Sequence, residues 1–223
     1  MALQWWQQSL SRSIQMSAQW GLTLQDVTLE GAGRTNAENV QKDLKPLIGK
    51  SIFSFDLENI QKTLLKYPWV ASVQVRRALP QGLVIVLEER RPKALWRSQG
   101  KLFLLDEEGK VVNIENIKPF STLPLLVGEE ANQEGISFLN LVKGYPSIFK
   151  VLKFAVWVSK RRWDIYLQDK DLKVQLAEDA LEKSLSHLQD LLEDERIQWD
   201  RIDVLDLRLE GRAFFLLKKG EKA

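Results

Sequence analysis

The first 90 residues change several times between strand-like and helix-like spacing of hydrophobic positions. Residues 22–31 (LTLQDVTLEG) alternate apolar and polar side chains and end at a glycine, which predicts a strand. Two amphipathic helices follow, the first capped by Thr35 or Asn36 and the second by Asp56. The stretches WVASVQVRRALP and QGLVIVLEERRP alternate again. The predicted order is strand, helix, helix, strand, strand.

A stiff corner joins the second predicted helix to the next strand. Pro68 has no backbone N–H and biases the preceding residue away from helix, so it should stop the helix. We expect Trp69 to be buried between the helices and the sheet, as a structural residue. Val73 and Val75 should then face the helices, with Arg76 pointing outward. Pro80, just before Gly82, predicts a tight turn into the last of these strands.

The remainder of the chain reads as a second unit that begins after Arg91. Short alternating stretches predict a mostly antiparallel sheet, ending in two strands at residues 201–209 and 212–219. Two helical stretches interrupt the strands, one at residues 131–153, with a break near Gly144, Tyr145 and Pro146, and one at 179–196. The fold class predicted for the whole chain is therefore α+β.

The first 21 residues predict an amphipathic helix, because Leu3, Trp6, Leu10 and Ile14 recur at helical spacing. No run of 18 apolar residues occurs in the sequence, so no membrane-spanning helix is predicted. Two interpretations remain open for this segment. It is either a surface helix packed on the domain or a juxtamembrane helix, and its tryptophans suit a membrane interface.

Charge is distributed unevenly, although the net charge is only +2. Residues 66–101 hold eight Lys/Arg against two Glu, and residues 178–210 hold eleven acids against four bases. A weakly charged chain with an acidic second half does not favour nucleic-acid binding. The sequence has no cysteine, which excludes disulfides, thiolate metal sites and a cysteine nucleophile.

Few residues favour catalysis. The chain has a single histidine, His187, within a predicted helix, and neither a phosphate-binding loop nor a full dinucleotide-binding fingerprint is present. We therefore predict a protein that is not an enzyme, with no cofactor, no metal and no small-molecule substrate. The function that remains is protein recognition. An enzyme with a cleft of carboxylates around His187 stays the alternative.

Several motifs together resemble the FtsQ/DivIB family of bacterial cell division proteins, in its Gram-negative form. They are VTLEGAGRT, the long stretch at residues 49–96 that contains PWV, VRRALP and ERRPKALW, and the later LPLLVG, RRWDIYL and IDVLDLRL. The resemblance covers residues 22–217. A POTRA domain alone would also fit a chaperone or an outer-membrane assembly factor, which would favour tandem POTRA repeats or a following barrel.

The resemblance implies a domain plan and a location. Residues 22–91 would form a POTRA domain, 92–218 the family's β domain and 219–223 a tail, with 1–21 just outside the membrane. Members are single-pass proteins of the inner membrane, and both domains lie in the periplasm at the division septum. The cytoplasmic tail and the spanning helix of that plan are not in this sequence. Trp96 would be a further structural residue, beside Pro68, Trp69 and Pro80.

The resemblance also implies partners. The family is a non-enzymatic scaffold of the divisome that links early division proteins to septal peptidoglycan synthesis, and its β domain binds FtsB and FtsL. A strand of the partner would add to the last strands of the sheet. The POTRA domain would bind other division proteins such as FtsK, for which we expect the exposed side of the first helix at residues 39–43. The positions that would bind FtsB are Arg161, Arg162, Arg208, Leu209, Ala213, Phe214, Phe215 and Leu216.

Overall fold

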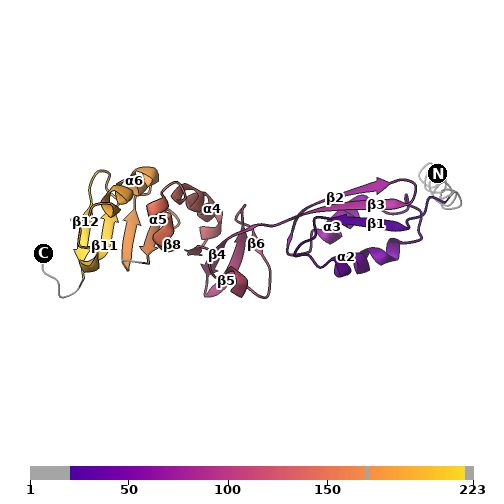
Figure 1. Ribbon diagram of the computed structural model, residues 1–223, viewed down its shortest axis with the longest axis horizontal. Coiled ribbons are helices and arrows are strands. Elements are labelled where there is room, and N and C mark those ends of the chain that lie inside the picture. The colour runs from indigo at the N-terminus through magenta and orange to yellow at the C-terminus, as the bar shows by residue number, and fades with distance from the viewer. Residues whose placement is uncertain (1–20, 169–170, 219–223) are drawn as a thin grey trace, which may run out of the picture. The chain divides into compact units, whose positions relative to one another are not determined.

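A computed structural model describes residues 21–168 and 171–218, and the chain divides into two compact units between Arg90 and Arg91 (Figure 1). The expected boundary lies one residue later. The predicted amphipathic helix at residues 1–20, the tail at 219–223 and part of the turn DKD lie outside the described residues. Within the described residues, no helix is both long enough and apolar enough to cross a bilayer.

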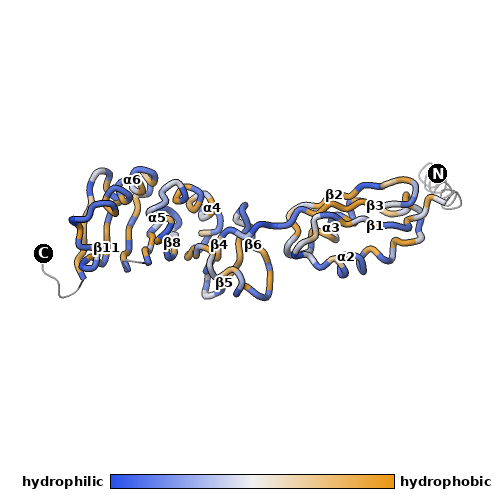
Figure 2. Tube along the Cα trace, viewed as in Figure 1, coloured by the Kyte–Doolittle hydropathy of each residue, from blue (hydrophilic) through white to orange (hydrophobic). Residues whose placement is uncertain are grey.

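The first unit has the predicted order of strand, helix, helix, strand, strand. Its three strands form a sheet in the order β1-β3-β2, with β1 parallel to β3 and β2 antiparallel to β3. Hydrophobic and hydrophilic residues follow one another along these strands, as expected for a sheet with one covered face (Figure 2). The elements are β1 (Asp26–Glu30), α2 (Ala37–Leu44), the 3₁₀ turn η1 (Lys45–Leu47), α3 (Leu57–Leu64), β2 (Val70–Ala78) and β3 (Gly82–Glu89).

Side-chain caps fix where both helices of the first unit begin. Asn36, rather than Thr35, caps α2: its side chain accepts hydrogen bonds from the N–H groups of Glu38 and Asn39. Asp56 caps α3 as predicted and accepts from the N–H of Glu58 at 3.0 Å. Such caps satisfy backbone donors that have no partner inside the helix. The helices bury Val40, Leu44, Ile60 and Leu64 against Leu83, Ile85 and Leu87 of β3.

The corner after α3 differs from the prediction. The helix ends at Leu64, well before Pro68, and Pro68 and Trp69 lie in a turn. Trp69 is only half-buried, so the prediction of a buried Trp69 is wrong. The guanidinium of Arg34 lies 5.1 Å from the centre of its ring, and the core position of the corner is the next residue, Val70. A large ring covered by a flexible cation remains partly in contact with solvent.

The carboxylate of Glu89 holds the loop between β1 and α2. Its Oε1 accepts hydrogen bonds from the N–H groups of Gly33, Arg34 and Thr35 at 3.0, 2.9 and 2.6 Å. Partial burial raises the pKa of Glu89, but the backbone donors of Arg34, Thr35 and Gly33 outweigh this and hold it below the ordinary value of 4.5. The last strand of the first unit thereby fixes the loop that leads into its first helix.

We expect Glu89→Ala to lower the free energy of unfolding of the first unit by about 1–3 kcal/mol, because three backbone donors lose a charged acceptor. The pKa of Glu89 is depressed in the folded chain. Its stabilising contribution is therefore complete above the ordinary pKa and is lost as the pH falls through the folded-state value. Urea unfolding at pH 7 and at pH 4 measures both effects. Glu88→Ala is the control, because Glu88 is exposed and its carboxylate accepts only from the hydroxyl of Ser72 among the described hydrogen bonds. An equal loss of unfolding free energy in the two variants would contradict the prediction.

The second unit is a sheet of nine described strands in the order β12-β11-β10-β9-β8-β7-β4-β5-β6. Most neighbours are antiparallel, as predicted, and the parallel pairs are β4 with β7, β7 with β8 and β10 with β11. The strands are β4 (Pro92–Ser98), β5 (Lys101–Asp106), β6 (Val111–Val112), β7 (Leu125–Val127), β8 (Leu152–Val158), β9 (Arg162–Leu167), β10 (Leu172–Leu176), β11 (Ile202–Leu207) and β12 (Phe214–Leu217).

The described residues of the second unit contain three α-helices, not two. The first helical stretch divides where the break was predicted, at Gly144 and Tyr145, into α4 (Ala131–Val142) and α5 (Pro146–Val151), because proline can begin a helix but not continue one. The third is α6 (Leu181–Leu192), which buries Leu185 and Leu188. Two 3₁₀ turns complete the unit, η2 (Lys118–Phe120) and η3 (Trp199–Arg201).

Aromatic residues organise the core of the second unit. Trp163 of β9 stacks on Phe138 of α4 at 4.5 Å between ring centres and contacts Trp157 of β8 at 4.8 Å. Trp96, predicted to be structural, is half-buried beside Phe103, and its indole N–H donates to the carbonyl of Gly128 at 2.8 Å. These contacts tie the helices to the middle of the sheet.

Candidate functional site

The last strand of the second unit lies at an end of its sheet and carries exposed apolar side chains. Among the described strands, β12 pairs only with β11. Phe214, Phe215 and Leu216 are 50%, 41% and 60% exposed, and Leu209, in the turn before β12, is 57% exposed. Large apolar side chains on an unpaired edge are unusual, because such an edge can pair with another chain.

The two faces of β12 differ. Phe215 pairs with buried Leu205 and lines a shallow hollow of about 320 Å³ with Ile197 and Arg201. Phe214 and Leu216 point to the other face, since side chains alternate along a strand. The predicted contact residue Ala213 packs against the core instead of lying exposed.

The backbone of β12 offers donors at the free edge. The N–H of Lys218 donates to the carbonyl of Arg201 at 2.9 Å, toward β11. Hydrogen-bonding directions alternate along an antiparallel strand, so Leu216 and Phe214 also point toward β11. The N–H groups of Phe215 and Leu217 therefore face away from the sheet, toward solvent.

The three arginines predicted to bind a partner lie together. Arg161, Arg162 and Arg208 line a hollow of about 340 Å³, in which Glu178, Asp179 and Glu210 also lie. Arg161 follows the turn between β8 and β9, where Ser159 and Lys160 both have positive φ. Arg208 comes directly after β11, which is separated from β9 only by β10. The fold thus brings together basic residues that are far apart in the sequence.

The three arginines differ in how accessible they are. The side chains of Arg161 and Arg208 are 57% and 48% exposed, but that of Arg162 is 16% exposed and pairs with Asp164 at 3.2 Å. Arg208 holds both carboxylate oxygens of Asp206, and this contact lowers the pKa of Asp206. Arg161 also pairs with Glu178 at 3.5 Å, so Arg161 and Arg208 are accessible but each has a carboxylate partner, whereas Arg162 is positioned by buried Asp164.

Asp164 is a site residue that the sequence reasoning missed. Its side chain is 2% exposed and lies between Arg162 and Lys173, with its carboxylate 3.2 and 3.0 Å from their nitrogens. A buried carboxylate of this kind is stable only when cations pair with it. Its signal in the sequence is an acid inside the otherwise apolar stretch WDIYL.

Other candidate residues do not converge on a reactive site. His187 is half-buried on α6, and no group of three metal-binding side chains occurs within the described residues. In the predicted FtsK-binding stretch at residues 39–43, Gln41 and Lys42 are exposed on α2, and Asp43 accepts a hydrogen bond from the hydroxyl of Tyr67 at 2.7 Å. Burial first, and then this contact, raise the pKa of Tyr67 to about 12.

Comparison with known proteins identifies both units. Residues 22–90 match the family model described as POTRA domain, FtsQ-type, and residues 94–208 match that described as Cell division protein FtsQ/DivIB, C-terminal. The extracytoplasmic domain of DivIB from Geobacillus stearothermophilus, a solved structure, covers 50% of this chain and 99% of its own at 16% identity and a TM-score of 0.33, too low to inform the fold.

Relatives named Cell division protein FtsQ occur in several bacteria. The Rickettsia conorii protein is 35% identical over 201 residues, 90% of this chain and 74% of its own length. The Rickettsia typhi protein is 34% identical over 194 residues, 87% and 72% of the two chains. The Agrobacterium fabrum protein is 28% identical over 200 residues, 90% and 63% of the two chains. The protein described here is therefore a member of the FtsQ/DivIB family of bacterial cell division proteins.

Proposed function

We propose that this protein is a non-enzymatic scaffold of the divisome that binds FtsB and FtsL through the free edge of β12. In this proposal it is a single-pass protein of the inner membrane whose two units lie in the periplasm at the septum. It links early division proteins to septal peptidoglycan synthesis. Other division proteins such as FtsK bind the POTRA unit.

One observation carries the proposal: β12 combines an unpaired backbone edge with exposed apolar side chains, and a hollow lined by three arginines and three acids lies close by. An added strand gains main-chain hydrogen bonds from the edge and selectivity from side chains. Phe214 and Leu216 supply apolar contacts on one face of the sheet. Arg161 and Arg208 attract an acidic partner segment, and such charges at the rim of an interface mainly accelerate association.

The proposal predicts that Phe215→Pro abolishes binding of a periplasmic FtsB segment. The N–H of Phe215 faces the free edge, so proline removes a donor to the partner without removing a hydrogen bond to β11. Phe215→Ala is the matched control, because it removes the ring and keeps the N–H. Isothermal titration of the full chain with the segment measures both variants, and circular dichroism confirms that each is folded.

The charge part of the same interface is tested separately. Arg161→Glu and Arg208→Glu should weaken binding, and the loss should shrink as salt is raised, because salt screens exposed charges. Lys62→Glu, an exposed reversal in the first unit, is the control. If folded Phe215→Pro binds as tightly as Phe215→Ala, strand addition at β12 is wrong. If the two arginine reversals act no differently from Lys62→Glu, the hollow lined by the three arginines is not part of the interface.

A further inference from the structure

The first unit also has a free strand edge, and only part of it is covered. The residues just before β1 are paired on that side with the loop after η1: Leu24 donates to the carbonyl of Lys50 at 2.9 Å and accepts from Gly49 at 2.8 Å. β1 itself pairs with β3 on its other side, and no described strand lies against the outer edge of Asp26–Glu30. The loop after η1 therefore pairs with the residues just before β1, but not with β1 itself.

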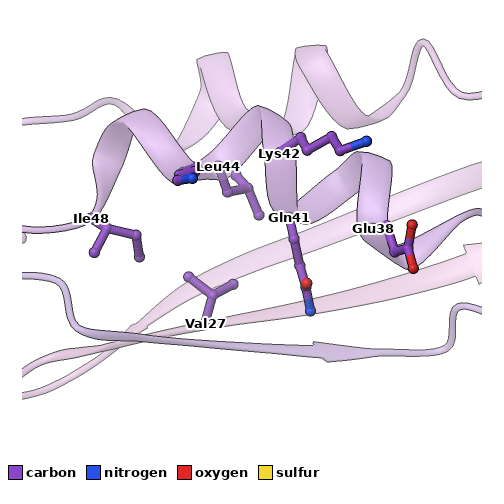
Figure 3. Close-up of a pocket in the computed structure, with 7 residues that line it drawn as sticks. Val27, Glu38, Gln41, Lys42, Leu44 and Ile48 are labelled. Carbon is purple, nitrogen blue, oxygen red and sulfur yellow. The ribbon is translucent and has the colours of Figure 1, made fainter.

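A groove runs beside this free edge, with Val27, Leu44 and Ile48 as its apolar lining and Glu38, Gln41, Lys42 and Lys45 as its polar lining. It has a volume of about 480 Å³ and lies between β1 and α2 (Figure 3). Val27 points from β1 toward the helix, and Leu44 and Ile48 point down toward the strand. Ile48 is 46% exposed although it sits at this groove. A strand added to β1 would place every second side chain in the groove, where aliphatic residues fit.

The opposite face of β1 is acidic. Asp26, Thr28 and Glu30 are exposed there, alternating with Val27 and Leu29. Within the described part of the chain, neither carboxylate is paired with a cation. A second copy of the chain is a poor occupant of this edge, because antiparallel pairing of β1 with itself would set Asp26 opposite Glu30. Like charges directly opposite one another destabilise a strand pair.

We propose that the free edge of β1 is a second binding site, which takes an extended segment of another protein with aliphatic residues at alternate positions and Lys or Arg between them. The aliphatic side chains enter the groove beside Leu44 and Ile48. The basic side chains pair with Asp26 and Glu30. This site lies on the POTRA unit and does not depend on the proposed role of β12.

A synthetic peptide of the sequence Thr-Lys-Val-Thr-Val-Lys-Thr tests the site. Antiparallel to β1, it sets its lysines opposite Asp26 and Glu30 and its valines over the groove. Titrated into the ¹⁵N-labelled full chain, it should shift the amide signals of β1 and of the groove side of α2, and leave those of β12 in place. A peptide of the same composition with adjacent valines should bind at least tenfold more weakly, because only one valine at a time can reach the groove.

Two sets of variants distinguish specific binding of the peptide at β1 from nonspecific hydrophobic or electrostatic binding. The double variant D26K/E30K should lose affinity for the lysine peptide by about tenfold or more and gain it for the peptide with glutamates in place of lysines. Ile48→Ser should weaken binding, whereas Leu65→Ser should not; Leu65 is a matched control because it is 47% exposed and does not line the groove. Absent shifts, equal binding of both peptides, or equal effects of Ile48→Ser and Leu65→Ser would each overturn the proposal.

Discussion

Asp164→Ala is expected to lower the free energy of unfolding of the second unit by about 3–5 kcal/mol, because it breaks a buried ion pair from one side only. Arg162 and Lys173 would then remain close together, with side chains only 16% and 30% exposed and no shared carboxylate between them. Urea unfolding of the full chain, followed by tryptophan fluorescence, measures the loss. The change should also remove the carboxylate that positions Arg162, and so weaken any partner binding at the hollow lined by Arg161, Arg162 and Arg208.

Two further variants show whether charge is the cause. Asp203→Ala removes an exposed carboxylate from β11, and it should cost little. The double variant D164L/K173L removes the carboxylate and one of its two cations, and it should recover part of the stability, since apolar side chains can replace a buried pair while Arg162 alone stays without its carboxylate. A loss for Asp164→Ala no larger than that for Asp203→Ala would show that the buried pair does not hold the sheet.

Gly31→Ala is expected to destabilise the first unit by roughly 2–5 kcal/mol, the sum of a backbone strain and a clash. Gly31 has a φ of +81°, where residues with a Cβ are strained. An added Cβ would also collide with the carbonyl oxygen of Leu87 in β3. Because that oxygen belongs to the backbone of the central strand, the contact cannot be relieved by rotating a side chain. Thermal unfolding of the full chain measures the change.

Gly49 offers a control that separates the two causes. Its φ is +82°, nearly equal to that of Gly31, but a Cβ there would meet nothing within 4 Å. Gly49→Ala should therefore show only the strain, about 1–2 kcal/mol. If the two alanine variants unfold alike, the close approach of Gly31 to β3 contributes nothing to the stability of the unit.

Local patterns predicted much of this fold. The cap at Asp56 and the alternation of Val73 and Val75 against Arg76 depend on residues a few positions apart. Helix caps and strand alternation are short-range effects, which a single sequence displays directly.

Contacts between distant residues were not predictable in the same way. The sequence shows two adjacent arginines, Arg76 and Arg77, but it does not show what they contact. In the fold, the guanidinium of Arg77 donates hydrogen bonds to the carbonyls of Ile52 and Phe55 at 2.7 and 2.9 Å. Trp69 was predicted to be buried from its size and position, yet the turn leaves it half-exposed under Arg34. Likewise, the free edge of β1 becomes visible only once the order of the strands is known.

The bond between Glu89 and the loop at Gly33 has a consequence for how the chain is made. The two residues are 56 positions apart, and β1 pairs only with β3, the strand that carries Glu89. Synthesis runs from the N-terminus at ~5–20 residues per second, so Glu89 is added to the chain ~3–11 s after the loop whose N–H groups it accepts from. During that interval the edge of β1 that pairs with β3 in the folded unit has no partner strand. The first unit can therefore close only once β3, the last of its strands along the chain, has been made.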